Sequence, residues 1–246
     1  MPNPHGTVVV VHGLGEHSGR YAHVIDALNR AGWSVIAYDQ RGHGRSPGPR
    51  GVLPRTDALL EDLAQIIDEA NAKRLVLLGH SMGGLVAARF VADNRRPVDA
   101  LVLTSPALKR TLKLVDRIKL AVGAALAPNA VLRNGLDSTK LSHDPDVVRA
   151  YQNDPLVHDK VSPRLVNFIL DSGRIVRERA RQWRVPTLLM WAGKDHLVDA
   201  EGSREFAAAA PRDVMTTREF PELYHEILNE GDARVFETLQ KWLAAA

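Results

Sequence analysis

The segment Gly-His-Ser-Met-Gly at positions 79–83 constrains the fold of this 246-residue chain more than any other. An apolar run of strand length, residues 74–78, leads directly into it, and a helical pattern begins at Met82. A serine between two glycines at a strand-to-helix turn is the pattern of a nucleophile elbow. The glycines are needed because the turn leaves no room for a Cβ beside the strained serine backbone. We therefore expect the Ser81 hydroxyl to project above a sheet, with the Met82 N–H at a helix start facing an oxyanion.

The rest of the chain alternates short apolar runs with helical patterns. This alternation predicts an α/β fold with a mostly parallel, doubly wound sheet of about six strands, covered on both faces. Strands are expected at 7–11, 33–38, 75–78, 100–103, 187–191 and 214–219, and helices at 21–31, 56–71, 82–92, 202–210 and 232–245.

Residues 107–184 break the alternation. They contain no convincing strand, several helical stretches and prolines at 128, 145, 155 and 163. About 80 residues are too many for a plain connection between consecutive strands. We expect 107–184 to form a helical cap over the carboxyl edge of the sheet, where open α/β sheets bind ligands. Residues 1–106 and 185–246 would then form the core.

A serine hydroxyl needs a base and an orienting carboxylate before it becomes a nucleophile. His225 follows the last expected strand and precedes the terminal helix, and Asp195 follows the strand before it. Both loops lie at the sheet edge that carries the elbow. The order Ser81, Asp195, His225 is the one that the hydrolase architecture with this elbow uses.

Other interpretations of these side chains are open at this point. A loop histidine is most often a solvated side chain, and Asp199 and Asp39 compete with Asp195. Asp199 can cap the following helix, whereas Asp39 can fix the glycine-rich loop after it. His196 is adjacent to Asp195 but should point elsewhere. A zinc-protease reading of residues 225–226 fails because Asn229 stands where a second histidine is needed.

A second oxyanion donor should come from the loop after the first strand. His-Gly-Leu-Gly at 12–15 makes the Leu14 N–H the candidate beside that of Met82. A plain strand-to-helix turn is the alternative, although it needs only one glycine. The glycine-rich loop at 39–46 lacks the Gly-x-x-x-x-Gly-Lys pattern of a phosphate cradle, so we interpret it as a structural loop bordering the site.

The amino-acid composition of the chain excludes several classes of function. The net charge is +3, and the 32 basic and 29 acidic residues are intermixed, which argues against nucleic acid as a partner. The absence of cysteine excludes disulfides, thiolate metal sites and a cysteine nucleophile, and it fits a reducing compartment. No apolar run approaches 18 residues and no signal pattern opens the chain, so we expect a cytoplasmic protein. The chemistry needs no metal or cofactor.

Several blocks together resemble the monoacylglycerol lipase family of α/β-hydrolases. The blocks are residues 12–21, 38–46, 79–84, 195–198 and 224–226, with Asp-Pro-Asp at 144–146 and Tyr-Gln-Asn-Asp-Pro-Leu at 151–156 in the expected cap. The family usually carries a leading pair of strands before the first block, where about ten residues stand here. A smaller sheet, a shortened chain and a misassigned start are all open explanations.

The resemblance implies roles for particular residues. It implies Ser81, Asp195 and His225 as a catalytic triad, and a cap that shapes an acyl tunnel. It also implies Leu14 and Met82 as oxyanion donors. Residues near the glycerol head group would be Glu16, Arg20 and Tyr151.

The implied function is hydrolysis of monoacylglycerols through an acyl-enzyme, with a small lipid ester as substrate. A lysophospholipase and a short-chain carboxylesterase are the enzymatic alternatives, and a catalytically silent ligand receptor is the alternative outside enzymes. The serine nucleophile excludes relatives that attack through an aspartate, such as haloalkane dehalogenases and epoxide hydrolases. Acyl-chain preference and oligomeric state are not indicated by the sequence.

The segment 109–126 places apolar residues near helical spacing among basic ones. One interpretation is a cap helix that lies on a lipid surface and takes substrate from it. The other is a cap helix packed on its neighbour with a solvated basic face.

Overall fold

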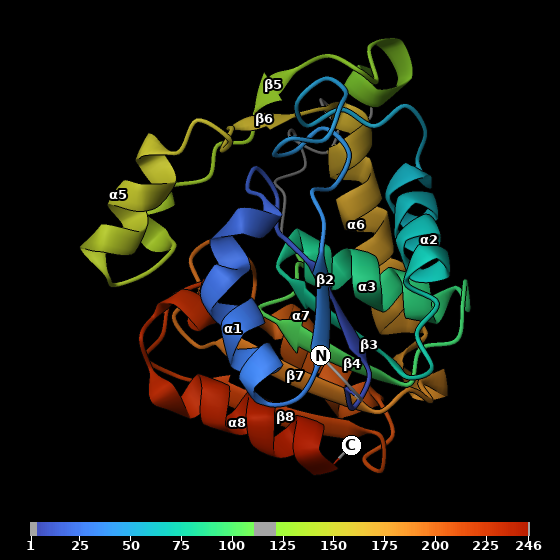
Figure 1. Cartoon of the computed structure of the whole chain (residues 1–246). Coiled ribbons are helices and arrows are strands. Elements are labelled where there is room, and N and C mark those ends of the chain that lie inside the picture. Colours follow the sequence, from blue (N-terminus) through green and yellow to red (C-terminus); the bar gives the residue numbers. More distant parts are fainter. Residues whose placement is uncertain (1–3, 111–121, 246) are drawn as a thin grey trace.

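The computed structural model describes residues 4–110 and 122–245, which form a sheet between two layers of helices (Figure 1). Six parallel strands lie in the order β2-β1-β3-β4-β7-β8. They are β1 (Thr7–Val11), β2 (Ser34–Ala37), β3 (Leu75–His80), β4 (Ala100–Thr104), β7 (Thr187–Ala192) and β8 (Met215–Phe220). The predicted parallel α/β sheet is confirmed, with each strand near its expected position.

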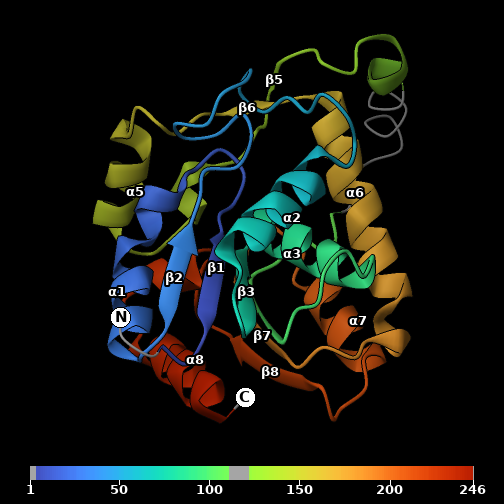
Figure 2. The same cartoon turned by 45° about the vertical axis from the view of Figure 1, so that its right-hand side comes forward.

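Successive side chains of each strand point to opposite faces, and both faces are buried in the four inner strands β1, β3, β4 and β7. Val8 and Val10 of β1 pack toward one face with α1 (Ala22–Arg30) and α8 (Ala233–Ala245). Val9 and Val11 pack toward the other face. That face is covered by α2 (Ala58–Ala70), α3 (Met82–Ala92), α6 (Pro163–Glu178) and α7 (Glu201–Ala209), as Figure 2 shows. Burial on both faces explains why the sequences of these inner strands are continuous apolar runs.

The segment between β4 and β7 carries α5 (Pro145–Asn153) and α6. Asp144 precedes α5 and caps it, because its side chain accepts a hydrogen bond from the Asp146 N–H. Ser162 caps α6 in the same way by accepting from the Leu165 N–H. Leu165 and Phe168 of α6 are buried in the same core as α3. α6 therefore covers the sheet face, whereas α5 lies beyond the end of the sheet (Figure 1).

Our expectation of no strand within 107–184 is wrong in one detail. Two short strands, β5 (Leu132–Arg133) and β6 (Lys160–Val161), pair antiparallel. A two-residue ladder is too short to produce a periodic signal in the sequence. The remaining short elements are 3₁₀ turns, namely η1 (Ser18–Tyr21), η2 (Ser138–Lys140), η3 (Ala180–Gln182) and η4 (Ile227–Asn229).

The predicted amphipathic helix at 109–126 lies mostly outside the described residues. Within the described part, residues 122–126 are helical, and the Val122 and Leu126 side chains are 51% and 82% exposed. Across residues 4–110 and 122–245, no helix is both long and apolar enough to cross a membrane.

Candidate active site

Ser81 stands at the turn between β3 and α3, with φ of 53° and ψ of −119°. Positive φ is uncommon for a residue other than glycine and stores backbone strain. The flanking glycines are required by close approach. A Cβ on Gly79 would lie 2.5 Å from the carbonyl oxygen of Gly83, and one on Gly83 would collide with the backbone of Val11 and His12. The turn is therefore the strained elbow that the sequence predicted.

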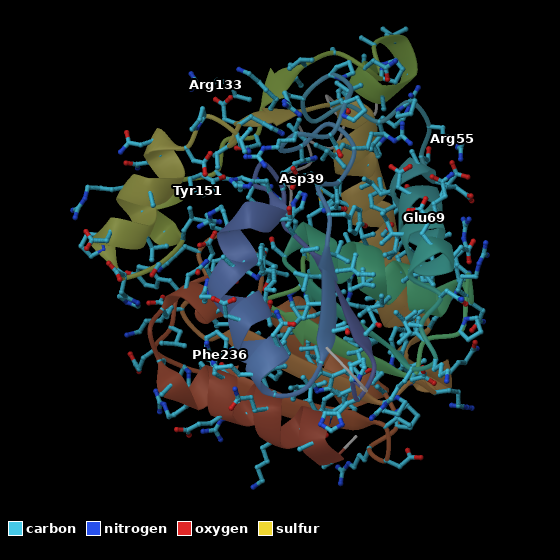
Figure 3. All side chains as sticks on the ribbon, in the orientation of Figure 1. Asp39, Arg55, Glu69, Arg133, Tyr151 and Phe236 are labelled. Atoms are coloured by element: carbon cyan, nitrogen blue, oxygen red, sulfur yellow. The ribbon has the colours of Figure 1, made fainter. Side chains whose placement is uncertain are left out.

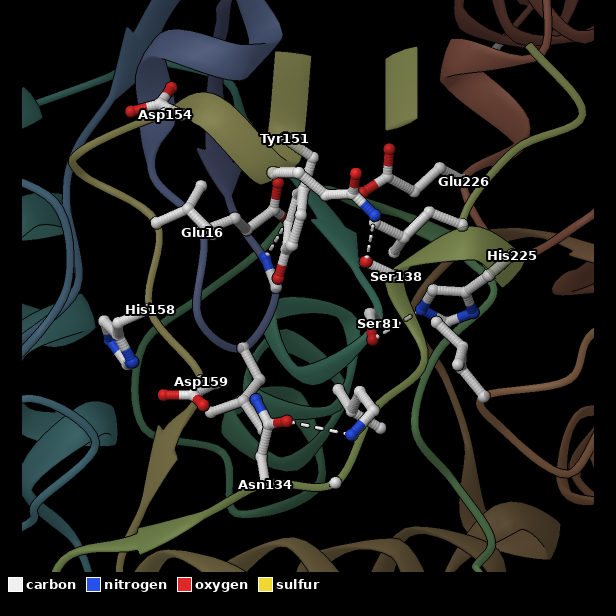
Figure 4. Close-up of a pocket in the computed structure, with 18 of the residues that line it drawn as sticks. Glu16, Ser81, Asn134, Ser138, Tyr151, Asp154, His158, Asp159, His225 and Glu226 are labelled. Atoms are coloured by element: carbon white, nitrogen blue, oxygen red, sulfur yellow. Dashed lines mark hydrogen bonds between the residues drawn. The ribbon is translucent and has the colours of Figure 1, made fainter. Parts of the chain in front are cut away.

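The structure brings Ser81, His225 and Asp195 together in the predicted order. Figure 4 shows the side chains of Ser81 and His225 next to each other. Ser81 Oγ donates to His225 Nε2 at 2.8 Å, and His225 Nδ1 donates to Asp195 Oδ2 at 2.7 Å. The other carboxylate oxygen, Oδ1, accepts from the N–H groups of Leu197 and Val198, both at 2.9 Å. The carboxylate is thus fixed on both sides and holds the imidazole with Nε2 free to accept a proton.

Burial and charge act in opposite directions on this pair. Burial lowers the pKa of His225, but the adjacent Asp195 carboxylate outweighs it, so the net pKa is above 6.5. Burial likewise raises the pKa of Asp195, yet the charge and hydrogen bond of His225 bring it below 3.8. Asp195 is therefore ionised at neutral pH. The neighbouring His80, its ring centroid 4.8 Å from that of His225, stays neutral because burial lowers its pKa to about 4.

The loop after β1 lies against the elbow. A Cβ on Gly13 would be 3.3 Å from Cβ of Ser81, so the backbone just before Leu14 closely approaches the nucleophile. Met82 is the first residue of α3, and a first-turn N–H has no acceptor within its own helix. The two backbone groups that the sequence singled out as oxyanion donors therefore belong to segments that adjoin Ser81, and their role stays a prediction.

The competing carboxylates have structural contacts. Asp39 accepts from the Ser18 N–H and hydroxyl through Oδ1 and from the Arg45 N–H through Oδ2, so it fixes the glycine-rich loop. Asp199 accepts from the Glu201 N–H at the start of α7. The His196 ring packs edge-on against Tyr224. These outcomes match the expected alternatives for each residue.

A cavity of about 620 Å³ opens above Ser81, between the loop after β1 and the segment that carries β5 and α5. Figure 3 shows Arg133 and Tyr151, two of its lining residues, at that end of the molecule. Its apolar side chains are Leu14, Leu136, Leu141, Val157 and Leu197, and its polar ones include Asn134, Ser138, Gln152, Asp154, His158 and Asp159. The sequence did not single out the polar lining residues of the 133–138 segment, because no motif marks them.

The three predicted head-group residues differ in position. Glu16 and Tyr151 line the cavity, but Arg20 is not among the described residues that do. Its guanidinium instead contacts two carboxylates, Glu16 and Glu226. Glu226 is a further residue at the site whose contact the sequence did not reveal, since it lies 206 positions from Arg20.

No group of three or more His, Asp or Glu side chains within residues 4–110 and 122–245 is arranged to hold a metal ion.

Comparison with known proteins places this geometry in a family. The family profile described as "Serine aminopeptidase, S33" matches residues 2–232. The chain belongs to this family of serine α/β-hydrolases. The resemblance to monoacylglycerol lipases is thereby confirmed at the level of the family.

Its relatives include lipases and a phospholipase. The chain is 34% identical to a monoacylglycerol lipase of Mycolicibacterium smegmatis, over 99% of this chain and 89% of that protein. It is 33% identical to a phospholipase of Bacillus subtilis, over 93% and 91% of the two chains. The crystal structure of Paleococcus ferrophilus monoacylglycerol lipase superposes with a TM-score of 0.91 at 35% identity, covering 97% and 94%. A Dictyostelium discoideum abhydrolase domain-containing protein is far longer, and the chain spans 26% of it.

Proposed function

We propose that this serine α/β-hydrolase cleaves monoacylglycerols, or similar single-chain esters, into a fatty acid and an alcohol. Ser81 attacks the ester carbonyl while His225 takes its proton and Asp195 stabilises the resulting imidazolium. The Leu14 and Met82 N–H groups bind the oxyanion. The alcohol leaves with the proton from His225, and a water activated by His225 then hydrolyses the acyl-enzyme.

The observation that carries this proposal is the hydrogen-bonded series from Ser81 through His225 to Asp195, at 2.8 and 2.7 Å, at the base of the cavity. A silent receptor would not need a strained serine hydrogen-bonded to an oriented base. The monoacylglycerol lipase relatives support the glycerol ester as substrate.

A lysophospholipid is the second candidate substrate, and the phospholipase relative favours it. A short-chain ester is the third. Hydrolysis of a series of glycerol esters of increasing acyl length, measured beside lysophosphatidylcholine and p-nitrophenyl butyrate, separates the three. The highest kcat/KM is expected for a glycerol ester, whereas a higher value for lysophosphatidylcholine would contradict the glycerol assignment.

Labelling by a fluorophosphonate tests the chemistry independently of the substrate. The probe should modify the wild-type protein and fail to modify Ser81→Ala, and the variant should also lose esterase activity. A wild-type protein that neither reacts with the probe nor hydrolyses any ester would support the receptor instead.

We propose further that residues 107–184 act as a cap that admits lipid. In support, the exposed apolar side chains Val122, Leu126, Val131 and Leu132 lie in this segment, and Leu132 is adjacent in sequence to Arg133, which lines the cavity. Such side chains can enter the boundary of a lipid surface. Sedimentation with phosphatidylcholine vesicles, with and without anionic phosphatidylglycerol, should recover the protein in the pellet, and replacing Leu126 and Leu132 with serine should reduce that fraction. Equal recovery of both proteins would reject the lipid contact.

A further inference from the structure

The side chain of Arg20 joins two buried carboxylates, Glu16 from the loop after β1 and Glu226 from the loop after β8. Nη1 donates to Oε2 of Glu16 and to Oε1 of Glu226, both at 2.6 Å, and Nη2 donates to Oε2 of Glu226 at 2.7 Å. The Arg20 side chain is 10% exposed and each carboxylate side chain is 4% exposed. A guanidinium that pairs with a carboxylate through two parallel bonds fixes orientation as well as distance.

The first carboxylate holds the loop that carries one oxyanion donor. Glu16 Oε1 accepts from the Gly13 N–H at 2.5 Å and from the Tyr21 hydroxyl at 2.7 Å. The carbonyl carbon of Gly13 is bonded to the nitrogen of Leu14, so the position of Glu16 sets that of the Leu14 N–H. Burial raises the pKa of Glu16, but Arg20 and other neighbours lower it to about 2, so the carboxylate is charged.

The second carboxylate holds the loop that carries the catalytic base. Glu226 is bonded to His225, and its own N–H donates to the Leu141 carbonyl at 2.8 Å. Its Oε2 also accepts from the Asn229 side chain at 2.9 Å. Movement of this carboxylate would therefore move the backbone beside His225.

We propose that Arg20 is a positioning residue that sets the distance between the oxyanion loop and the His225 loop. This proposal rests on the proposed esterase function and differs from the head-group role that the family resemblance implied for Arg20. Figure 4 shows Glu16, Tyr151 and Glu226 on one side of the cavity above Ser81. The guanidinium lies over the Tyr151 ring, 4.8 Å from its centroid, and three of its N–H···O contacts go to carboxylates.

The distance between the Glu16 and Glu226 carboxylates depends on the guanidinium that lies between them. One guanidinium faces two buried carboxylates, and without it they would repel each other at low dielectric. Glu16 and Glu226 would separate, and the Leu14 N–H would shift relative to the oxyanion. Displacements of about 1 Å in a catalytic group can lower a rate about 100-fold.

The deciding experiment measures kcat and KM of Arg20→Lys on a glyceryl ester and on the methyl ester of the same fatty acid. Lysine keeps the positive charge but lacks the planar fork that pairs with Glu226 through two parallel bonds while it also reaches Glu16. A positioning role predicts that kcat falls about 10- to 100-fold for both esters, with KM changed less than about twofold. A head-group ligand would instead raise KM for the glyceryl ester alone, and that result would overturn the proposal.

Two further variants control for folding. Glu226→Gln keeps the shape of the side chain but removes one charge, and it should lower kcat for both esters in the same ratio. Arg89→Lys is the matched control, because Arg89 makes a half-buried pair with Asp93 on α3, and its kcat should stay within about twofold of wild type. Thermal unfolding of all variants establishes that they are folded.

The rate of fluorophosphonate labelling separates failure of this proposal from failure of the proposed function. The probe has no glycerol head group and needs only the nucleophile, the base and the oxyanion donors. If wild-type protein hydrolyses neither ester, the proposed substrate class is wrong, and the labelling rates still decide the role of Arg20. Slower labelling of Arg20→Lys and Glu226→Gln supports positioning, whereas labelling at the wild-type rate refutes it.

Discussion

Ser81 Oγ lies 2.8 Å from His225 Nε2, although 144 residues separate the two positions. Ser81 follows β3 and His225 follows β8, and the strands between them in the sheet are β4 and β7. All these strands run parallel, so their carboxyl ends meet at one edge. Ser81 and His225 are therefore close in space, because the strands that precede them run in the same direction and end at the same edge of the sheet.

Asp195 should be needed for the chemistry, whereas Asp199 should not. Asp195→Asn keeps the shape of the side chain but loses the charge that stabilises the His225 imidazolium, and kcat should fall about 10³- to 10⁴-fold. Asp199→Asn is the matched control, because Asp199 contacts the start of α7, and its kcat should stay within about twofold. Ester hydrolysis at saturating substrate compares them, and similar losses in both variants would contradict the assignment.

The pH profile should report the titration of His225. His225 acts as a base only when neutral, and its pKa is raised above 6.5, so activity should decline as pH falls through that pKa. Asp195 contributes most to raising the pKa, followed by Glu226. Glu226→Gln should therefore move the acidic limb of kcat/KM to lower pH.

Glu222→Gln is the control for that profile, since Glu222 is exposed and pairs with Lys194. An acidic limb that stays in place in Glu226→Gln, or that moves equally in Glu222→Gln, would show that the charge of Glu226 does not act on His225.

The parts of the site that the sequence predicted are those that local chemistry determines. The elbow follows from Gly79 and Gly83, because a tight strand-to-helix turn excludes a Cβ. The positions of Asp195 and His225 follow from strand order, since each lies in the loop after a predicted strand. The same periodicity located all six strands of the main sheet.

The parts that the sequence did not predict depend on contacts between distant segments. Nothing near Arg20 indicates that Glu226 will be its partner, and a two-residue strand such as β5 has no period to detect. The family resemblance placed Arg20 near the substrate, but it could not separate contact with substrate from contact with the residues behind it. Such contacts form only when the chain folds and its loops pack against each other at the edge of the sheet.

Gly83→Ala should disrupt the elbow. The added methyl group would collide with the backbone carbonyls of Val11 and His12 at the end of β1, which cannot move away as a flexible side chain could. Overpacking of this kind costs about 1–3 kcal/mol, and activity should fall because Ser81 and the oxyanion loop shift together. Urea unfolding and kcat measure the two effects. Gly123→Ala, where the nearest atoms lie at an ordinary 3.5 Å from the new Cβ, should lose no stability.

Glu16 should make stability depend on pH in the acidic range. Its pKa is about 2 in the folded protein against an ordinary value of 4.5 for a glutamate, so the folded state favours the ionised form. The stabilisation is fully present above pH 4.5 and is lost as pH falls toward 2. It amounts to about 3 kcal/mol, since each pKa unit is worth about 1.4 kcal/mol. The free energy of unfolding of Glu16→Gln should therefore lie below that of wild type at pH 7.

The difference between wild type and Glu16→Gln should shrink as the pH is lowered, because protonation removes the same charge from wild type. Urea unfolding at pH 7, 5, 4 and 3 measures it. Glu69→Gln, with an exposed side chain on α2 (Figure 3), provides the control and should differ little from wild type at any of these pH values. A difference for Glu16→Gln that is constant from pH 7 to 3 would mean that its loss of stability comes from packing and not from the ion pair with Arg20.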